Sequence, residues 1–267
     1  MPTLFRMLRA GVSCGLLALA GHAVAAQAEG AAAPAQLLQS SEQLMLVVTP
    51  DWDAVDGQMQ MFRRDQAGGE WLAVGKANRI AVGRTGLAWG AGLHAAQTEG
   101  PQKKEGDGKA PAGVFTLGQA FGYAATLKTG LHYTPMGATN YCVDVPGSPL
   151  YTQIVDSQVV GEAAVKDSTE PMRRDLHAKG DQRYKEGFVI EHNAANASGV
   201  GSCIFAHLWK APGEATAGCT AMAEPTMDHL LAWLDARKQP LLVQLPRAEY
   251  ERLRASWKLP AIDGAAP

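Results

Sequence analysis

The sequence predicts a mainly β fold, a sandwich or barrel-like domain with a few short helices. Its apolar segments are short, closely spaced and separated by turns that contain glycine or proline, which is typical of such folds. The 29 glycines among 267 residues favour frequent turns and close backbone approaches. Only residues 224–237 carry apolar side chains at helical spacing over a long segment. Together these observations favour one β-rich domain.

Composition narrows the range of partners. Hydrophobic residues make up 46% of the chain, enough for a sizeable core, and the formal net charge is −2. This balance excludes a strongly basic nucleic-acid-binding protein and a polybasic membrane-binding patch. It also lies far from the low hydrophobicity and high charge of disordered proteins. We therefore expect a globular protein with no nucleic-acid partner.

The N-terminus has the layout of a secretory signal peptide. Arg6 and Arg9 precede a short apolar stretch at residues 10–20, and small residues suited to cleavage follow at 23–28. The apolar stretch is too short for a comfortable membrane span, although an uncleaved anchor is the alternative. Cys14 begins this stretch instead of following it, which argues against a lipoprotein cleavage site. We predict a signal peptide over residues 1–25 and an exported, periplasmic protein without stable membrane insertion after cleavage.

The elements of the mature chain are predicted from local patterns. Residues 26–42 form a linker rich in small residues, and residues 43–246 form one domain, because no shift in composition marks a second. Within residues 58–63, methionine and glutamine alternate as in a half-buried strand. Strands are expected at residues 43–49, 58–63, 70–74, 79–82, 113–117, 140–145, 187–191, 202–207 and 241–245.

Loops and helices complete the prediction. Residues 83–92 contain four glycines and are expected to form a turn-rich loop, and the charged segment 102–109 is expected to form a solvated loop. A helix is predicted over residues 224–237. Residues 247–267 are expected to form a short surface helix at 248–257 and a frayed, alanine-rich tail at 261–267.

One cysteine and one histidine form a candidate nucleophilic pair. His207 ends a predicted strand, and Cys219 follows it by twelve positions on a glycine-containing turn. An imidazole beside a thiol can take its proton and return it to a leaving amine. Gly218 allows a sharp turn that aims neighbouring N–H groups at a developing oxyanion. The alternatives are two packed residues at strand ends, or a zinc site formed by Cys203, His207 and Cys219.

Cysteine parity supports a free thiol. Removal of the signal peptide leaves three cysteines, and an odd number in an exported protein leaves one without a partner in the chain. If Cys219 is the working thiol, Cys142 and Cys203 form the disulfide. Such a bond closes a loop of about 60 residues, for which loop-closure entropy gives roughly 4 kcal/mol of stabilisation.

The ordered motifs of the chain resemble the L,D-transpeptidase catalytic family of the YkuD type. That family has a strand-borne histidine followed by a Ser/Thr-x-Gly-Cys turn, which His207, Thr216, Gly218 and Cys219 match. The chain is similar to a divergent branch with GSCIF-x-H-x-W and TAGCTAM motifs. The likeness extends over residues 43–246 and includes residues 83–90, 105–108, 111–115, 121–123, 201–209 and 216–222.

The resemblance implies a mainly β catalytic domain that acts on peptidoglycan stem peptides in cell wall biogenesis. Cys219 would attack the carbonyl of an L-residue joined to a D-residue, commonly the bond between mesodiaminopimelate and D-alanine. His207 would act as base and then acid, while backbone N–H groups around Gly218, Cys219 and Thr220 would stabilise the oxyanion. Thr216 would help to position the turn. The acyl-enzyme would pass to an amine or to water, and no cofactor or metal is expected.

Three departures distinguish the chain from the common family pattern. Thr220 and Ala221 stand where a hydrophobic residue and an arginine usually follow the cysteine, and Leu208 replaces a glycine. The loop between His207 and Cys219 is also shorter. The substrate therefore stays open, and an L,D-carboxypeptidase, another hydrolase using the same site, and a non-catalytic cell-wall-binding module are the alternatives.

Three further residues are candidates for the substrate groove. Trp209 follows His207 by two positions and lies on the same strand face if the strand continues. His192 and Asn193 end the preceding predicted strand and are expected to line the same cleft. Packing or a solvent-facing role is the alternative for each of them.

Overall fold

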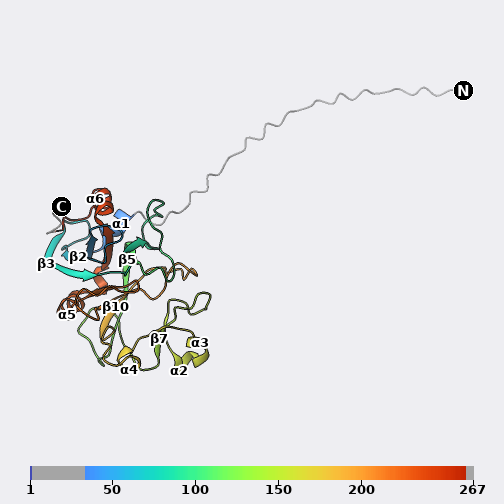
Figure 1. The fold of residues 1–267 in the computed structure, drawn as a ribbon. Helices are drawn as coiled ribbons and strands as arrows, with labels where there is room; N and C mark the ends of the chain where they lie inside the picture. Colours follow the sequence, from blue (N-terminus) through green and yellow to red (C-terminus); the bar gives the residue numbers. More distant parts are fainter. Residues whose placement is uncertain (2–33, 263–267) are drawn as a thin grey trace. The chain divides into compact units, whose positions relative to one another are not determined.

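The computed structural model describes Met1 and residues 34–262, so the predicted signal peptide, residues 26–33 of the predicted linker and residues 263–267 lie outside the described residues. Residues 34–262 belong to one compact unit (Figure 1). The unit is mainly β with a few short helices, which confirms the predicted fold class.

A ten-stranded sheet forms the frame of the unit. Its order is β10-β11-β12-β3-β2-β1-β13-β5-β4, with β6 added beside β5. Because β10 also pairs with β5, the sheet closes on itself in a barrel-like manner. The strands are β1 (Gln43–Thr49), β2 (Asp56–Arg63), β3 (Leu72–Ala81), β4 (Leu87–Trp89), β5 (Ala110–Gly122), β6 (Tyr133–Pro135), β10 (Glu186–Ile190), β11 (Phe205–Leu208), β12 (Thr220–Met222) and β13 (Leu241–Pro246).

A second, three-stranded sheet has the order β8-β7-β9. Its strands are β7 (Asn140–Cys142), β8 (Ile154–Asp156) and β9 (Glu170–Pro171), and the short helices α2 (Ser157–Val160), α3 (Glu162–Val165) and α4 (Arg174–His177) are interspersed with them. In Figure 1 this group, drawn in yellow-green to yellow, lies together on the side of the unit away from β1, β2 and β3. It is inserted in the chain between β6 and β10, so it reaches the main sheet close to the strands that carry the candidate site.

The main core lies between β1, β13 and the helices that cover them. Every residue of β1 and of β13 is buried, which explains why both strands are continuous apolar segments in the sequence. Helix α5 (Glu224–Trp233) adds Met227, Leu230 and Leu231 to this core. The other helices are α1 (Pro34–Ser40), the 3-10 helix η1 (Ala236–Lys238) and α6 (Arg247–Leu253).

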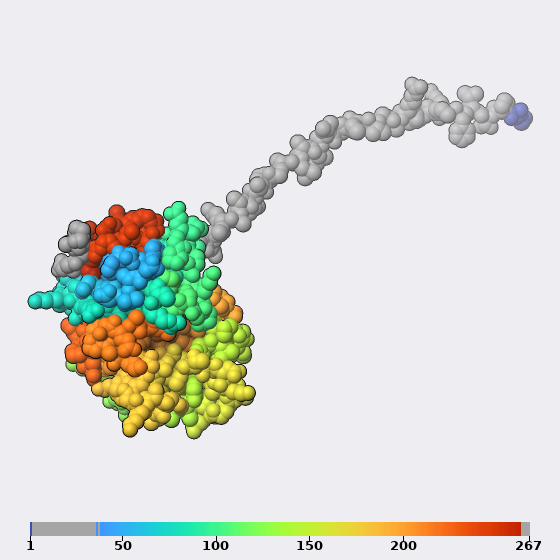
Figure 2. Space-filling view, viewed as in Figure 1, coloured from blue at the N-terminus to red at the C-terminus, as the bar shows by residue number. Residues whose placement is uncertain are grey.

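Both ends of the described chain pack more firmly than the sequence suggested. Residues 34–40 of the predicted linker form α1, and its Leu38 is buried in the main core. Beyond α6, Trp257, Leu259 and Ile262 are also buried in that core. Of the predicted tail at 261–267, only residues 261 and 262 are described, and Ile262 is packed in the core. In the space-filling view of Figure 2, the blue surface of α1 adjoins the red surface of the C-terminal segment.

Several strand boundaries differ from prediction for local reasons. The two strands expected at 70–74 and 79–82 are a single strand, β3, whose pairing with β2 shifts register between Met59 and Met61. Gln60 is buried instead of solvent-facing, because its amide donates to the carbonyls of Val74 (3.0 Å) and Gly75 (3.3 Å).

Backbone conformation explains three other differences. Strand β11 begins at Phe205 and not at 202, because Gly201 and Cys203 have positive φ angles of 120° and 55°. The predicted helix over 224–237 stops at Trp233, where Leu234 becomes extended (φ −64°, ψ 135°). The predicted loop at 83–92 contains the short strand β4.

The charged segment 102–109 is not the solvated loop that its composition predicts. The Lys103 side chain is only 4% exposed, and its Nζ lies 2.7 Å from Asp107 Oδ1. Glu105 Oε2 accepts hydrogen bonds from Ser202 Oγ (2.8 Å) and from the Tyr151 hydroxyl. These contacts join the segment to the chain just before β11, which positions one side of the candidate site.

Within the residues that the structure describes, none of the helices has the length and apolarity needed to cross a membrane.

Candidate active site

The fold brings the two motif segments together on neighbouring strands. Strands β11 and β12 run parallel, with Ala206 opposite Thr220 and His207 opposite Ala221. Cys219 immediately precedes β12, so it lies next to the strand that carries His207. His207 is 4% exposed and Cys219 is 6% exposed, and both line one small cavity. The structure therefore places the two residues of the predicted pair on one cavity.

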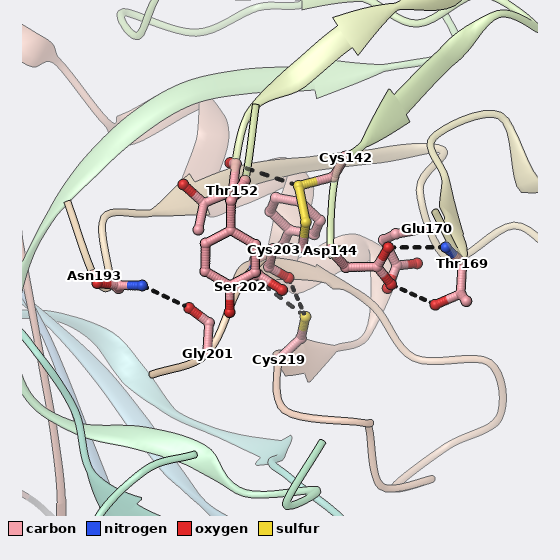
Figure 3. The surroundings of a disulfide bond; sticks show 12 residues. Cys142, Asp144, Thr152, Thr169, Glu170, Asn193, Gly201, Ser202, Cys203 and Cys219 are labelled. Carbon is pink, nitrogen blue, oxygen red and sulfur yellow. Dashed lines mark hydrogen bonds between the residues drawn. A yellow bond between two sulfur atoms is a disulfide. The ribbon is translucent and has the colours of Figure 1, made fainter. Parts of the chain in front are cut away.

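The Cys219 thiol is held by backbone groups of the preceding segment. The N–H of Phe205 donates to Cys219 Sγ at 3.3 Å, and Sγ lies 3.6 Å from the Cys203 carbonyl oxygen, to which it donates. Figure 3 shows Cys219 beneath Cys203, whose own sulfur bonds to Cys142. The structure thus contains the predicted disulfide, with Cys219 as the free cysteine among the described residues.

The disulfide connects the two sheets beside the thiol. Cys142 is the last residue of β7 in the small sheet, and Cys203 precedes β11 in the main sheet. Both cysteines and Cys219 belong to a second apolar cluster, separate from the main core. The other members of that cluster are Phe121, Met136, Met172, Tyr184 and Phe205.

His207 is oriented by its own strand. Its Nδ1 lies 2.7 Å from the Leu208 carbonyl oxygen. Because a carbonyl only accepts, this contact assigns the proton to Nδ1 and leaves the lone pair of Nε2 available as a base. The Tyr184 ring packs edge-on against the imidazole, with ring centroids 5.2 Å apart. A backbone carbonyl therefore plays the orienting role for which the sequence offered no acidic candidate.

Burial keeps both members of the pair uncharged. Burial raises the pKa of the Cys219 thiol to about 11, although the Phe205 N–H and the charges of Arg174, Lys103 and Arg183 oppose the shift. Burial also lowers the pKa of His207 to about 4, and the nearby Arg183 and Arg174 lower it further. At neutral pH the resting pair is therefore a thiol and a neutral imidazole. Proton transfer has to accompany the attack of sulfur on a substrate.

The cavity that Cys219 and His207 share has a volume of about 50 Å³, and many of the side chains that line it are polar or charged. Arg174 forms an ion pair with Glu170, and its guanidinium carbon lies 4.9 Å from the centre of the Tyr184 ring. Arg183 lies on the same cavity and pairs with Asp181. The remaining lining residues include Trp209, Lys210, Glu214, Thr216, Ala217 and Ala221.

The turn before Cys219 is fixed by Thr216. Its hydroxyl donates to the Cys219 carbonyl oxygen (2.7 Å) and accepts from the Gly218 N–H (3.1 Å). A Cβ on Gly218 would lie 3.1 Å from the Lys109 carbonyl oxygen, so close backbone approach favours glycine here. The Gly218 N–H is already bonded, which removes it from the oxyanion donors that the sequence suggested.

The Thr220 side chain points away from the cavity. Its hydroxyl donates to Gln244 Oε1 at 2.8 Å, and the Gln244 amide donates to the Pro111 carbonyl at 2.9 Å. All of these atoms are buried, so the Thr220 side chain connects β12 to β13 and β5. Only the backbone of Thr220 remains a candidate for the oxyanion role.

Two of the three predicted groove residues lie elsewhere. Trp209 lines the cavity of Cys219, as expected. His192 instead packs against Phe115 and contacts the Val200 carbonyl through Nε2 (3.2 Å). Asn193 is buried, and its amide donates to the carbonyls of Ala197 (2.9 Å) and Gly201 (3.1 Å). Both residues stabilise the 193–201 loop, because their side chains hydrogen-bond to its backbone carbonyls where the chain turns back before β11.

Sequence reasoning missed the groups that surround the histidine. Glu170 and Arg174 come from the small sheet and α4, while Arg183 and Tyr184 precede β10. The only signal for them was the density of arginines in residues 173–183, a segment without apolar periodicity. Their role depends on the insertion between β6 and β10, which no local pattern predicts.

The disulfide contradicts the zinc alternative. Cys203 is bonded to Cys142 and therefore cannot supply a thiolate ligand together with His207 and Cys219. Across residues 34–262, no group of three or more histidine, cysteine, aspartate and glutamate side chains is arranged to hold a metal ion.

Neither a family model, a curated protein nor a solved structure matches the chain in the comparisons.

Proposed function

We propose that this protein is an exported cysteine acyltransferase of the L,D-transpeptidase type that acts on peptidoglycan stem peptides. The observation that carries the proposal is the placement of Cys219 and His207, from separate motifs, on one cavity, with Cys219 directly before β12 and His207 on the adjacent parallel strand β11. A free thiol beside a neutral imidazole oriented through Nδ1 has the parts needed for acyl transfer.

The chemistry follows from the protonation states. Cys219 Sγ attacks the carbonyl of the L-centre while His207 Nε2 removes the thiol proton, so a thiolate never has to persist in the buried site. Collapse of the tetrahedral intermediate breaks the C–N bond, and the imidazolium returns its proton to the departing amino group of the D-residue. The thioester is then consumed by an amine in transpeptidation or by water in hydrolysis.

Substrate entry requires one wall of the site to move. The cavity of about 50 Å³ is far smaller than the roughly 300 Å³ or more of typical ligand pockets. Its lining includes Trp209, Lys210, Glu214, Ala215 and Thr216. Residues 209–216 contain no helix, and only their two ends hydrogen-bond to neighbouring strands or bridges, Trp209 to Met222 and Thr216 to Val82 and Arg84. We expect this segment to shift when a stem peptide binds.

A product analysis tests the proposal. Mature protein and its Cys219→Ala variant are incubated with tetrapeptide muropeptides and a D-amino acid, and products are read by mass spectrometry. A cysteine-dependent cross-linked or exchanged product supports a transpeptidase. Loss of D-alanine alone supports the L,D-carboxypeptidase alternative. Unchanged muropeptides would contradict both and leave the non-catalytic cell-wall-binding alternative.

A further inference from the structure

Arg183 lines the cavity of Cys219 and has donor capacity that its pairing with Asp181 leaves unused. Its Nε and Nη2 hydrogen-bond to Asp181 at distances of 2.5 to 3.1 Å, in the forked arrangement typical of arginine and a carboxylate. A guanidinium has a second forked edge, formed by Nη1 and Nη2. No described residue hydrogen-bonds to Nη1 of Arg183, whose side chain is 32% exposed. Asp181, 5% exposed, therefore fixes the guanidinium without saturating it.

The other charges of the cavity are matched among themselves. Arg174 pairs with Glu170, and Lys210 and Glu214 contribute one charge of each sign. Net charge therefore does not draw an anion to this site, and directional hydrogen bonds have to do so. Of the two arginines, Arg183 is the more exposed, because the Arg174 side chain is 15% exposed and lies over Tyr184.

We propose that Arg183 binds the terminal carboxylate of the D-residue that leaves during acylation. This inference rests on the proposed function and assigns a specificity-determining residue to it. In a peptide that ends in a D-residue, the terminal carboxylate is separated from the scissile nitrogen by a single carbon. A donor on the same small cavity as Cys219 Sγ is therefore within reach of it. The contact holds the scissile carbonyl at sulfur and selects substrates with a free C-terminus.

The test combines one variant with one substrate change. Acylation of Cys219 is measured with a tetrapeptide ending in D-alanine and with the same peptide carrying a C-terminal carboxamide. Arg183→Gln is expected to lower kcat/KM for the free acid by about 10- to 100-fold, as for loss of a charge-assisted hydrogen bond. For the carboxamide, the variant and the wild type should differ by less than about threefold, because the wild type has already lost the ionic contact.

Arg237→Gln is the matched control. Arg237 also pairs with an aspartate two residues before it, Asp235, but its side chain is 90% exposed and it does not line the cavity. Its removal should leave both substrates unaffected. If Arg183→Gln does not fold, the wild type alone supplies the test, because it should prefer the acid to the carboxamide by the same 10- to 100-fold.

The outcomes distinguish failure of the carboxylate site at Arg183 from failure of the proposed acyltransferase function. Equal loss for both substrates in Arg183→Gln, or equal use of both by the wild type, overturns the carboxylate site while the acyltransferase proposal stands. Absence of Cys219-dependent acylation with either peptide overturns the proposed function and this inference together.

Discussion

Acidification should destabilise the wild-type protein more than a His207→Gln variant. Burial lowers the pKa of His207 from 6.5 to about 4, so the unfolded chain binds a proton at this position before the folded protein does. Stability from this group is complete above pH 6.5 and is lost as the pH falls toward 4. A shift of this size corresponds to about 3 kcal/mol in total, of which about 2 kcal/mol falls between pH 7 and pH 5.

The variant isolates this group from the others. Other buried groups titrate in the same range, notably His94 and His192, whose pKa burial lowers to about 4, and Glu186, whose pKa burial raises to about 7. The effects of these other groups cancel when the pH-dependent loss of unfolding free energy in the variant is subtracted from that in the wild type. Urea unfolding of wild type, His207→Gln and the exposed-residue control His132→Gln at pH 7 and pH 5 measures it.

The decisive quantity is the loss of unfolding free energy between pH 7 and pH 5. The wild type should lose about 2 kcal/mol more than His207→Gln between the two pH values, and His132→Gln should behave as the wild type does. Equal losses in wild type and His207→Gln would refute the lowered pKa of the buried imidazole. The folded-state pKa would then match the unfolded value of 6.5, and a minor part of the imidazole would carry a proton at neutral pH.

Three more predictions follow from the contacts around the thiol. Replacing both Cys142 and Cys203 by alanine should lower the free energy of unfolding by about 4 kcal/mol in urea titrations, because the bond closes a loop with a sequence separation of 61. Thr220→Val leaves Gln244 without its buried partner and should cost about 1–3 kcal/mol, with little change in acylation rate per folded molecule; a large rate loss would place this hydroxyl in the oxyanion site. Thr216→Val removes two hydrogen bonds of the turn and should lower the free energy of unfolding by about 1–2 kcal/mol. It should also slow acylation more than tenfold in acid-quenched time courses. An unchanged acylation rate would show that the turn keeps its shape without these hydrogen bonds.

Local patterns predicted the parts of the site that depend on local sequence. His207 is part of an apolar strand segment, and Cys219 follows a glycine in a turn, so each element was recognisable alone. Cysteine parity then predicted the bond between Cys142 and Cys203. The parallel pairing of β11 with β12 brings these parts together.

The remaining parts depend on contacts between distant segments. Tyr184 packs against the histidine and Arg174 lies over Tyr184, and both residues come from the segment between β9 and β10, where no hydrophobic period indicates such a placement. The charged segment 102–109 looked solvated by composition, yet Lys103 is buried by its pairing with Asp107. His192 was misplaced because a positive φ at Cys203 delays the start of β11 and leaves a loop where a continuous strand was expected.

The motif has no arginine after Cys219, but two arginines from other segments line the cavity of the thiol. Ala221, at the position where the resembled family has that arginine, lines the cavity, and Arg174 and Arg183 line the same cavity from other segments. Arginine side chains, each paired with a carboxylate, thus line the cavity of the thiol although the local motif lacks an arginine.

Mass spectrometry of the intact protein tests the central claim most directly. Wild-type protein, Cys219→Ala and His207→Gln are mixed with a tetrapeptide ending in D-alanine, quenched in acid and weighed. We expect the wild type to carry an adduct equal to the peptide minus D-alanine, located on the fragment that contains Cys219. This adduct should be absent from Cys219→Ala and strongly reduced in His207→Gln. D-alanine release by Cys219→Ala at the wild-type rate, or no adduct and no release by the wild type, would contradict it.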